Sequence, residues 1–208
     1  MNLPDDIALR LAVHEAAAPL SLDALPPGER DRVGGFGSEK RRREFALGRT
    51  TARALLADHL AVAAPDVPLR VAADGAPELD GGRLHVSIAH AATSERTLAA
   101  AAVSPRPVGV DLEVIRPRRA DLYRFMLHPD EYGLLETLPH DHDAAQILVW
   151  TLKEATLKAM RTGFRVSPKK LRLSVDPERQ AATVSVEEGG SWSLVYDQRD
   201  GCFVAVAF

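Results

Sequence analysis

Two carboxylates stand two residues apart in the otherwise apolar segment V108-G-V-D-L-E113. A β-strand sends alternate side chains to the same face, so Asp111 and Glu113 are predicted to share one face, and Val110 and Leu112 the other. Two like charges on one face are unfavourable unless a positive group lies between them. The pattern therefore indicates either a cation-binding strand or an edge strand with solvated acids.

A second segment with reactive side chains is W150-T-L-K-E-A-T-L-K158. Its spacing predicts a helix on which Glu154 and Lys158 lie along one stripe, with Lys153 beside it. Alone it describes an ordinary helix with one Glu–Lys pair. Together with the strand, it brings a third carboxylate to Asp111 and Glu113. Three oxygen ligands with room for water and phosphate suit Mg²⁺, whereas the chain has no Cys/His set for zinc.

A third segment, L84-H-V-S-I-A-H90, reads as a strand that ends in a histidine. A histidine in this place is commonly a capping or surface residue. Combined with Arg49, Lys153 and Lys158, however, His90 would supply cationic partners for a diphosphate that bridges the metal.

Helical periodicity predicts two long helices, at residues 39–62 and 144–160. Two short helical pieces, split at Pro129, are expected within residues 118–138, and residues 26–40 form a polar segment rich in Pro, Gly and charge. Short apolar runs predict strands, at residues 7–14, 69–73, 84–90, 97–103, 108–114, 170–175 and 182–187, followed by a hairpin over 192–208 that turns at Asp200-Gly201. This order predicts an α+β fold of two halves.

The two halves show an internal repeat. F45-A-L-G-R49-T-T-A-R53 aligns with W150-T-L-K-E154-A-T-L-K158 at an offset of 105 residues, and T97-L-A-A-A-A-V103 aligns with C202-F-V-A-V-A-F208 at the same offset. Helix amphipathicity could produce part of this match. We expect an N-terminal lobe over 1–105, a C-terminal lobe with the metal site over 106–208, and an active site in the cleft between them.

Composition restricts the function further. Lys and Arg total 26 against 29 acids, a net charge of −3, which argues against a nucleic-acid binder even though K40-R-R-R43 is basic. The single cysteine, Cys202, suits a reducing compartment. The N-terminus has no signal-peptide pattern, and the longest apolar run is too short to cross a membrane. We expect a cytoplasmic, monomeric protein.

The four motifs resemble those of one enzyme family. G109-V-D-L-E113, followed about forty residues later by W150-T-L-K-E-A-T-L-K158, resembles the paired signature of the phosphopantetheinyl transferases. The upstream F45-A-L-G-R49 and V86-S-I-A-H90 resemble the larger, Sfp-type branch. The resemblance implies two lobes related by pseudo-twofold symmetry, each with a long helix and a small antiparallel sheet.

The resemblance also implies a reaction. The phosphopantetheine arm of coenzyme A would pass to a serine of an acyl, peptidyl or aryl carrier protein, of polyketide or nonribosomal peptide assembly, with release of adenosine 3',5'-bisphosphate. Mg²⁺, or alternatively Mn²⁺, would be held by Asp111, Glu113 and Glu154, and Glu154 would help remove the serine proton. Coenzyme A would be bound by basic and hydroxyl side chains: Arg49, Ser87, His90, Lys153 and Lys158.

Two departures from the family pattern motivate an alternative. Ala89 and Ala91 flank His90 where the family usually has hydroxyl residues, and Ala76 replaces a lysine expected near the nucleotide. Arg70 and the basic run 40–43 are the candidates to compensate for that lysine. The alternative function is a catalytically weak relative that binds coenzyme A or a carrier protein without efficient transfer.

Two further segments carry expectations. Residues 116–126 combine basic and apolar side chains that suit an acidic carrier helix, namely Arg116, Arg118, Arg119, Leu122, Arg124, Phe125 and Met126. H140-D-H-D143 contains metal-binding residue types, but its position between two helices favours a solvated connection.

Overall fold

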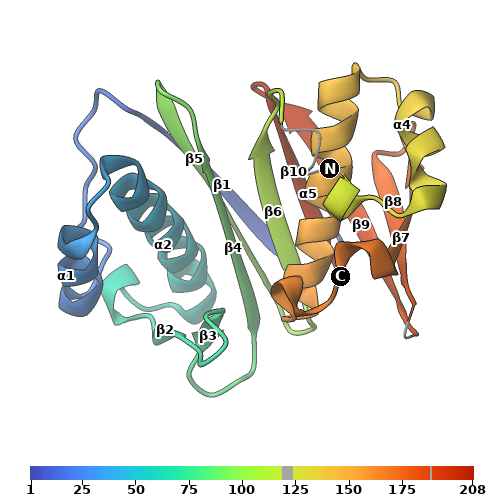
Figure 1. Cartoon of the computed structure of the whole chain (residues 1–208). Helices are drawn as coiled ribbons and strands as arrows, with labels where there is room; N and C mark the ends of the chain where they lie inside the picture. The colour runs from blue at the N-terminus through green and yellow to red at the C-terminus, as the bar shows by residue number, and fades with distance from the viewer. Residues whose placement is uncertain (119–123, 188) are drawn as a thin grey trace. The chain divides into compact units, whose positions relative to one another are not determined.

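The computed structural model describes residues 1–118, 124–187 and 189–208 (Figure 1). The chain divides into two compact units. The N-terminal unit comprises Pro4–Arg106, and the C-terminal unit comprises Pro107–Phe208 together with Met1–Leu3. Residues 119–123 of the predicted carrier-binding stretch, which include Arg119 and Leu122, lie outside the described residues.

One long helix on a three-stranded antiparallel sheet forms the N-terminal unit. The strand order is β1 (Ala8–Glu15), β5 (Arg96–Ser104), β4 (His85–Ala92). Helix α2 (Glu39–Leu60) packs on this sheet (Figure 1). Its apolar stripe meets the sheet in a core of buried residues, which includes Ala52, Leu55, Leu56, Val86, Ala101 and Val103.

Smaller elements complete this unit. They are α1 (Pro27–Gly35), a 3-10 turn η1 (Ala64–Asp66), and the two-stranded β2 (Leu69–Val71) and β3 (Pro77–Leu79). Helix α1 lies in the polar segment 26–40, for which the sequence pattern predicted no helix. Its sequence has no apolar stripe, and Val33 is its one buried residue.

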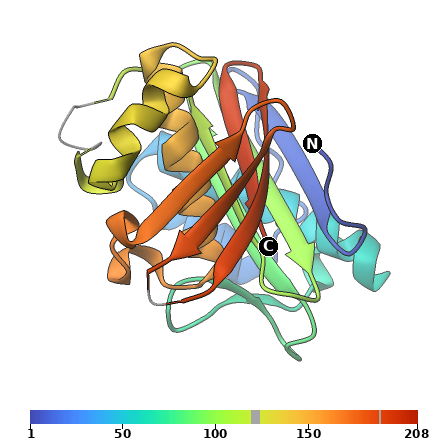
Figure 2. The same cartoon turned by 90° about the vertical axis from the view of Figure 1, so that its right-hand side faces the viewer.

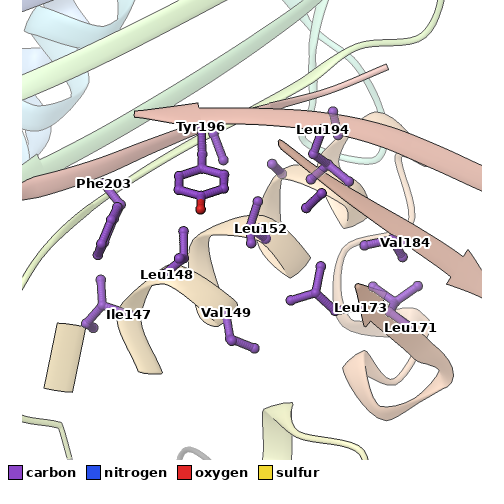
Figure 3. Packing of buried hydrophobic residues seen from close by; sticks show 14 of the residues in the cluster. Ile147, Leu148, Val149, Leu152, Leu171, Leu173, Val184, Leu194, Tyr196 and Phe203 are labelled. Atoms are coloured by element: carbon purple, nitrogen blue, oxygen red, sulfur yellow. The ribbon is translucent and has the colours of Figure 1, made fainter. Parts of the chain in front are cut away.

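The C-terminal unit has a five-stranded antiparallel sheet and the second long helix. The strand order is β6 (Gly109–Val114), β10 (Cys202–Ala207), β9 (Ser191–Arg199), β8 (Ala181–Val186), β7 (Leu171–Asp176). Helix α5 (His142–Ala159) packs on this sheet, and Figure 2 shows strands β7 to β10 facing the viewer. Figure 3 shows their shared core, in which Leu148 and Leu152 lie near Tyr196 and Leu194.

Turns and short helices position these elements. Two 3-10 turns, η3 (Gly163–Arg165) and η4 (Pro168–Lys170), join α5 to β7. The 3-10 turn η2 (Pro129–Glu131) leads directly into α4 (Tyr132–Thr137). Asp141 caps α5, because its Oδ1 accepts a hydrogen bond from the Ala144 N–H at 2.8 Å. The hairpin predicted at the C-terminus is confirmed, with Asp200 and Gly201 at its turn in the positive-φ region.

The α+β fold predicted from the sequence is confirmed, with a long helix and an antiparallel sheet in each unit. The strand alignment of the internal repeat, however, is displaced by one residue. Ala101 and Val103 of β5 pack with α2, whereas Ala205 and Ala207 of β10 pack with α5. An offset of 105 maps Ala101 onto Val206, which lies on the opposite face of β10. Among the described helices, none has the length and apolar composition needed to span a membrane.

Candidate active site

Strand β6 carries the two acids on one face, as the alternation predicted. Val110 and Leu112 are buried on the other face, with exposed fractions of 0% and 5%. Asp111 is itself 6% exposed, so it is a buried carboxylate and not a solvated acid of an edge strand. Burial of a charged group is costly unless it has a partner.

Gly109 brings this strand unusually close to α5. A Cβ atom at position 109 would lie 2.0 Å from the Ala155 carbonyl oxygen and 2.4 Å from the Ala159 nitrogen. Only glycine fits this contact, because both atoms belong to the helix backbone and cannot move aside alone. The contact places Asp111, two residues farther along β6, beside the last turns of α5.

Asp111 forms an ion pair with Lys158 of α5. The Lys158 Nζ donates to Asp111 Oδ1 at 2.8 Å. The other oxygen, Oδ2, is buried and has no hydrogen-bond partner among the described residues. An orphaned buried carboxylate oxygen is costly, and it is the kind of atom that a metal ion or a hydroxyl donor would satisfy.

Glu113 has a different cationic partner. The Arg118 Nη2 donates to Glu113 Oε2 at 2.5 Å, and both side chains are 23% exposed. Burial raises the pKa of Glu113 above its ordinary value, and the nearby Asp111 adds to this rise, while Arg118 and Lys158 oppose it. Sequence reasoning assigned Arg118 to carrier binding and did not connect it with Glu113.

Glu154 of α5 is the most perturbed acid of the group. Burial raises its pKa to about 7, and the charges of Asp111 and Glu113 contribute to this rise, while Lys158 opposes it. These electrostatic interactions show that the three acids share one environment. A carboxyl group that titrates near neutral pH is suited to accept a proton from a substrate hydroxyl.

The residue types suit a hard divalent cation, but their present geometry does not form a finished site. Within the described ranges, no three His, Cys, Asp or Glu side chains converge closely enough to hold a metal ion. Asp111 and Glu113 are instead bound to Lys158 and Arg118. The orphaned Asp111 Oδ2 and the all-oxygen donor set fit Mg²⁺, provided that these cations give way.

Lys153 does not join this group, contrary to our prediction that it contacts coenzyme A. Its side chain is fully buried, and Nζ donates to Glu131 Oε2 and to the carbonyl oxygens of Met126 and Pro168, at 2.5, 2.8 and 3.1 Å. Three bonds use all three ammonium protons. Burial lowers the pKa of Lys153, while the charge of Glu131 opposes this shift.

Arg49 of α2 is also bound inside its own unit. Its guanidinium donates to Glu29 of α1 and to the Leu69 carbonyl oxygen, and Arg53 donates to the same Glu29 carboxylate. Although burial opposes it, the bonds from Arg53 and Arg49 hold the pKa of Glu29 below its ordinary value. With 5% exposure, Arg49 fixes α1 to α2 in this structure, which does not fit the predicted contact with the nucleotide.

Ser87 and His90 both lie on β4 but on opposite faces. Ser87 is buried with Ala89 and Ala91, whereas His90 is exposed. His90 lies near α2, because a Cβ atom built on Gly48 would be 3.6 Å from its Cδ2 atom. The structure therefore gives His90 the accessibility that a phosphate contact requires, and Ser87 does not have it.

The remaining candidates have structural partners. Arg70, considered as a substitute for the lysine missing at position 76, pairs with Glu78 and Asp80. In the H140-D-H-D143 segment, Asp141 caps α5, and the His140 ring packs edge-on against Phe203 at 5.2 Å. Both observations give that segment a structural role.

Comparison with known families identifies relatives for both units. Residues 107–206 match the model of the 4'-phosphopantetheinyl transferase superfamily, and residues 37–104 match the model of the 4'-phosphopantetheinyl transferase N-terminal domain. A comparison with curated proteins gave no match. The two family matches adjoin and together span most of the chain, and the second points to the Sfp-type branch. The family predicted from the motifs is thus confirmed: the chain belongs to the phosphopantetheinyl transferase superfamily.

Proposed function

We propose that this protein transfers the 4'-phosphopantetheine arm of coenzyme A to a serine of a carrier protein in a Mg²⁺-dependent reaction. The observation that carries the proposal is the group formed by Asp111, Glu113 and Glu154, beside Lys158, at the contact between β6 and α5. Within this superfamily, such a group has an immediate use in phosphoryl transfer, which mainly needs positioning and charge neutralisation.

The chain's own groups divide the work. Asp111, Glu113 and Glu154 would hold the metal ion, which would neutralise charge on the diphosphate of coenzyme A. Lys158 adds a positive charge beside them, and His90 is a further proposed phosphate contact. Arg49, Ser87 and Lys153 are left out of the proposed site, because the structure buries all three.

Glu154 is the proposed general base. Its carboxylate takes the proton of the carrier serine, and the serine oxygen attacks the phosphorus that bears the pantetheine arm. That phosphorus loses its bond to the bridging oxygen, and adenosine 3',5'-bisphosphate leaves. Burial raises the pKa of Glu154 to about 7, and a bound metal ion would lower it, so the carboxylate is ionised and able to accept a proton at neutral pH.

An aromatic pair on the C-terminal unit is the proposed carrier-binding surface. Phe125 and Phe164 are 46% and 54% exposed, and their rings contact each other at a tilted angle of 58°, with centroids 5.6 Å apart. The exposed Arg124 stands next to Phe125 and offers a positive charge to an acidic carrier helix. Met126, also predicted to contact the carrier, is 1% exposed and belongs to the interior instead.

A weak, binding-only relative is the second candidate. Two observations favour it: the three carboxylates do not converge in the described structure, and the β4 positions beside His90 are Ala89 and Ala91. In either case we propose a monomeric cytoplasmic protein, consistent with a single, buried cysteine that forms no disulfide.

Intact mass spectrometry of an apo carrier domain tests the proposal. The carrier is incubated with this protein, coenzyme A and Mg²⁺, in parallel with the Asp111→Asn variant and with a metal-free reaction containing EDTA. A mass gain of one phosphopantetheine group, lost in both controls, is expected. Coenzyme A binding without any mass gain on acyl, peptidyl or aryl carriers would support the binding-only relative, and neither binding nor gain would refute the proposal.

A further inference from the structure

Arg118 lies beside the proposed metal ligands but has no role in the proposed reaction. It follows β6 by four residues and turns back so that its guanidinium binds Glu113, one of the proposed metal ligands. With 23% of its side chain exposed, it belongs to the site and not to the open surface.

The Arg118 guanidinium also has unused donor capacity. Its Nε is buried and has no hydrogen-bond partner within the described part of the chain. A guanidinium carries five N–H donors arranged to bind two oxygens of a carboxylate or phosphate at once. A buried donor without an acceptor is unfavourable, so this arrangement is suited to a second anionic partner.

A metal ion and Arg118 compete for the same carboxylate. Arg118 is a direct cationic partner of Glu113, as Lys158 is of Asp111. A dication placed on Glu113 would repel the guanidinium at close range. The displaced guanidinium would then favour the strongest anion beside the metal, which for the proposed substrate is a diphosphate.

We infer that Arg118 is a substrate-binding residue: it holds Glu113 until a divalent metal takes this carboxylate, and it then binds the diphosphate of coenzyme A. This inference rests on the proposed function. It predicts two effects of opposite sign for the Arg118→Met variant. The metal alone binds more tightly, because its competitor is gone, and coenzyme A binds less tightly, because a phosphate ligand is gone.

Isothermal titration calorimetry of the full chain measures both effects without a carrier protein, so that no turnover occurs. Mn²⁺ is titrated alone, and coenzyme A is titrated at saturating Mg²⁺. For Arg118→Met we expect the Mn²⁺ dissociation constant to fall about twofold to fivefold and that of coenzyme A to rise about tenfold. Arg118→Lys retains the charge without the bidentate geometry, and its values should lie between those of wild type and Arg118→Met.

Arg116→Met is the matched control, since Arg116 is exposed and the change removes the same charge two residues away. Equal effects in Arg116→Met and Arg118→Met would overturn the inference, because they would show only a general charge effect. Weaker Mn²⁺ binding in Arg118→Met would also overturn it, because Arg118 would then support the metal ligand instead of competing for it. Failure of the wild-type protein to bind coenzyme A would instead refute the proposed function itself.

Discussion

The acids of the proposed site are held by neighbouring cations. Asp111 binds Lys158 and Glu113 binds Arg118, whereas the pKa of Glu154 rises to about 7. This distribution limits the electrostatic cost of three neighbouring, partly buried carboxylates. Two of them have a direct cationic partner, and the third becomes neutral easily.

The raised pKa of Glu154 predicts a pH-dependent stability difference. The folded-state pKa of this carboxyl group lies above its unfolded value of about 4.5, so ionisation is less favourable in the folded protein. The free energy of unfolding therefore falls as pH rises from 4.5 to about 7, and it stays at the lower level above pH 7. Glu154→Gln mimics the protonated form. In EDTA at pH 8 we expect this variant to melt a few degrees above wild type, and at pH 4.5 to 5 the two should agree within about a degree.

Differential scanning fluorimetry across this pH range measures the effect. Glu136→Gln, at an exposed position of α4, is the control for removal of one negative charge and should change little at either pH. A Glu154→Gln variant that is no more stable than wild type at pH 8 would contradict a strained carboxylate at position 154.

The sequence indicated the side chains whose positions follow from strand alternation or helix spacing. It did not indicate the partners of side chains that pair with residues far away in the chain. Strand alternation placed Asp111 and Glu113 on one face of β6, and helix spacing placed Glu154 and Lys158 on one stripe of α5; in the structure Lys158 pairs with Asp111. The ion pairs of Arg49 and Lys153 could not be predicted from the spacing of residues along the sequence. Each is neutralised by one glutamate about twenty residues away, in segments without any apolar periodicity that would have placed them.

At the scale of elements, the site depends on how closely β6 approaches α5. Gly109 permits a strand-to-helix contact that no side chain would allow. The acids and Lys158 extend from these two elements, so a small displacement of either one would change their spacing. The pairing of β6 with β10 sets the position of the strand, and the cap at Asp141 sets where α5 begins.

Gly109→Ala is therefore expected to be strongly destabilising. The added methyl group meets helix backbone at 2.0 Å, and overpacking of this kind costs about 3 kcal/mol or more. Urea unfolding measures the cost. Gly133→Ala is the matched control, because a Cβ atom there meets no described atom within 4 Å and alanine favours the α4 helix. Equal stability of the two variants would refute the close contact.

A second prediction at this scale concerns the buried pair of Lys153 and Glu131. Lys153→Met leaves a buried carboxylate without its cation, which costs about 3 to 5 kcal/mol. Adding Glu131→Gln should recover part of this loss, because the amide carries no charge. A double-mutant cycle in urea measures the coupling, and strictly additive losses would show that the two side chains do not interact.

At the scale of the whole molecule, the two units have the same arrangement of a long helix on an antiparallel sheet, but they differ in strand number and in strand alignment. Both units carry a long helix on an antiparallel sheet, and both match models of the same superfamily. The repeat in the sequence identified this plan. It misplaced the strand by one residue, because runs of small apolar residues such as those of β5 align equally well in either phase.

Carrier recognition is tested at this scale. Phe164→Ala removes half of the exposed aromatic pair, and we expect a rise of about tenfold in KM for the carrier protein with unchanged coenzyme A binding. Tyr132→Ala, which truncates an exposed aromatic side chain outside this pair, is the control. Similar effects of both substitutions on KM, or weaker coenzyme A binding in Phe164→Ala, would contradict a carrier surface at this pair.

The pair formed by Glu131 and Lys153 restricts how the sequence can change during evolution. The Glu131 carboxylate also accepts hydrogen bonds from the backbone N–H groups of His128 and Leu173, so it joins three separate stretches of the chain. A lineage that lost either charge alone would bury the other without compensation. Descendants of a common ancestor should therefore keep both residues or replace both, and position 131 should be as constrained as the reactive acids although it takes no part in the chemistry.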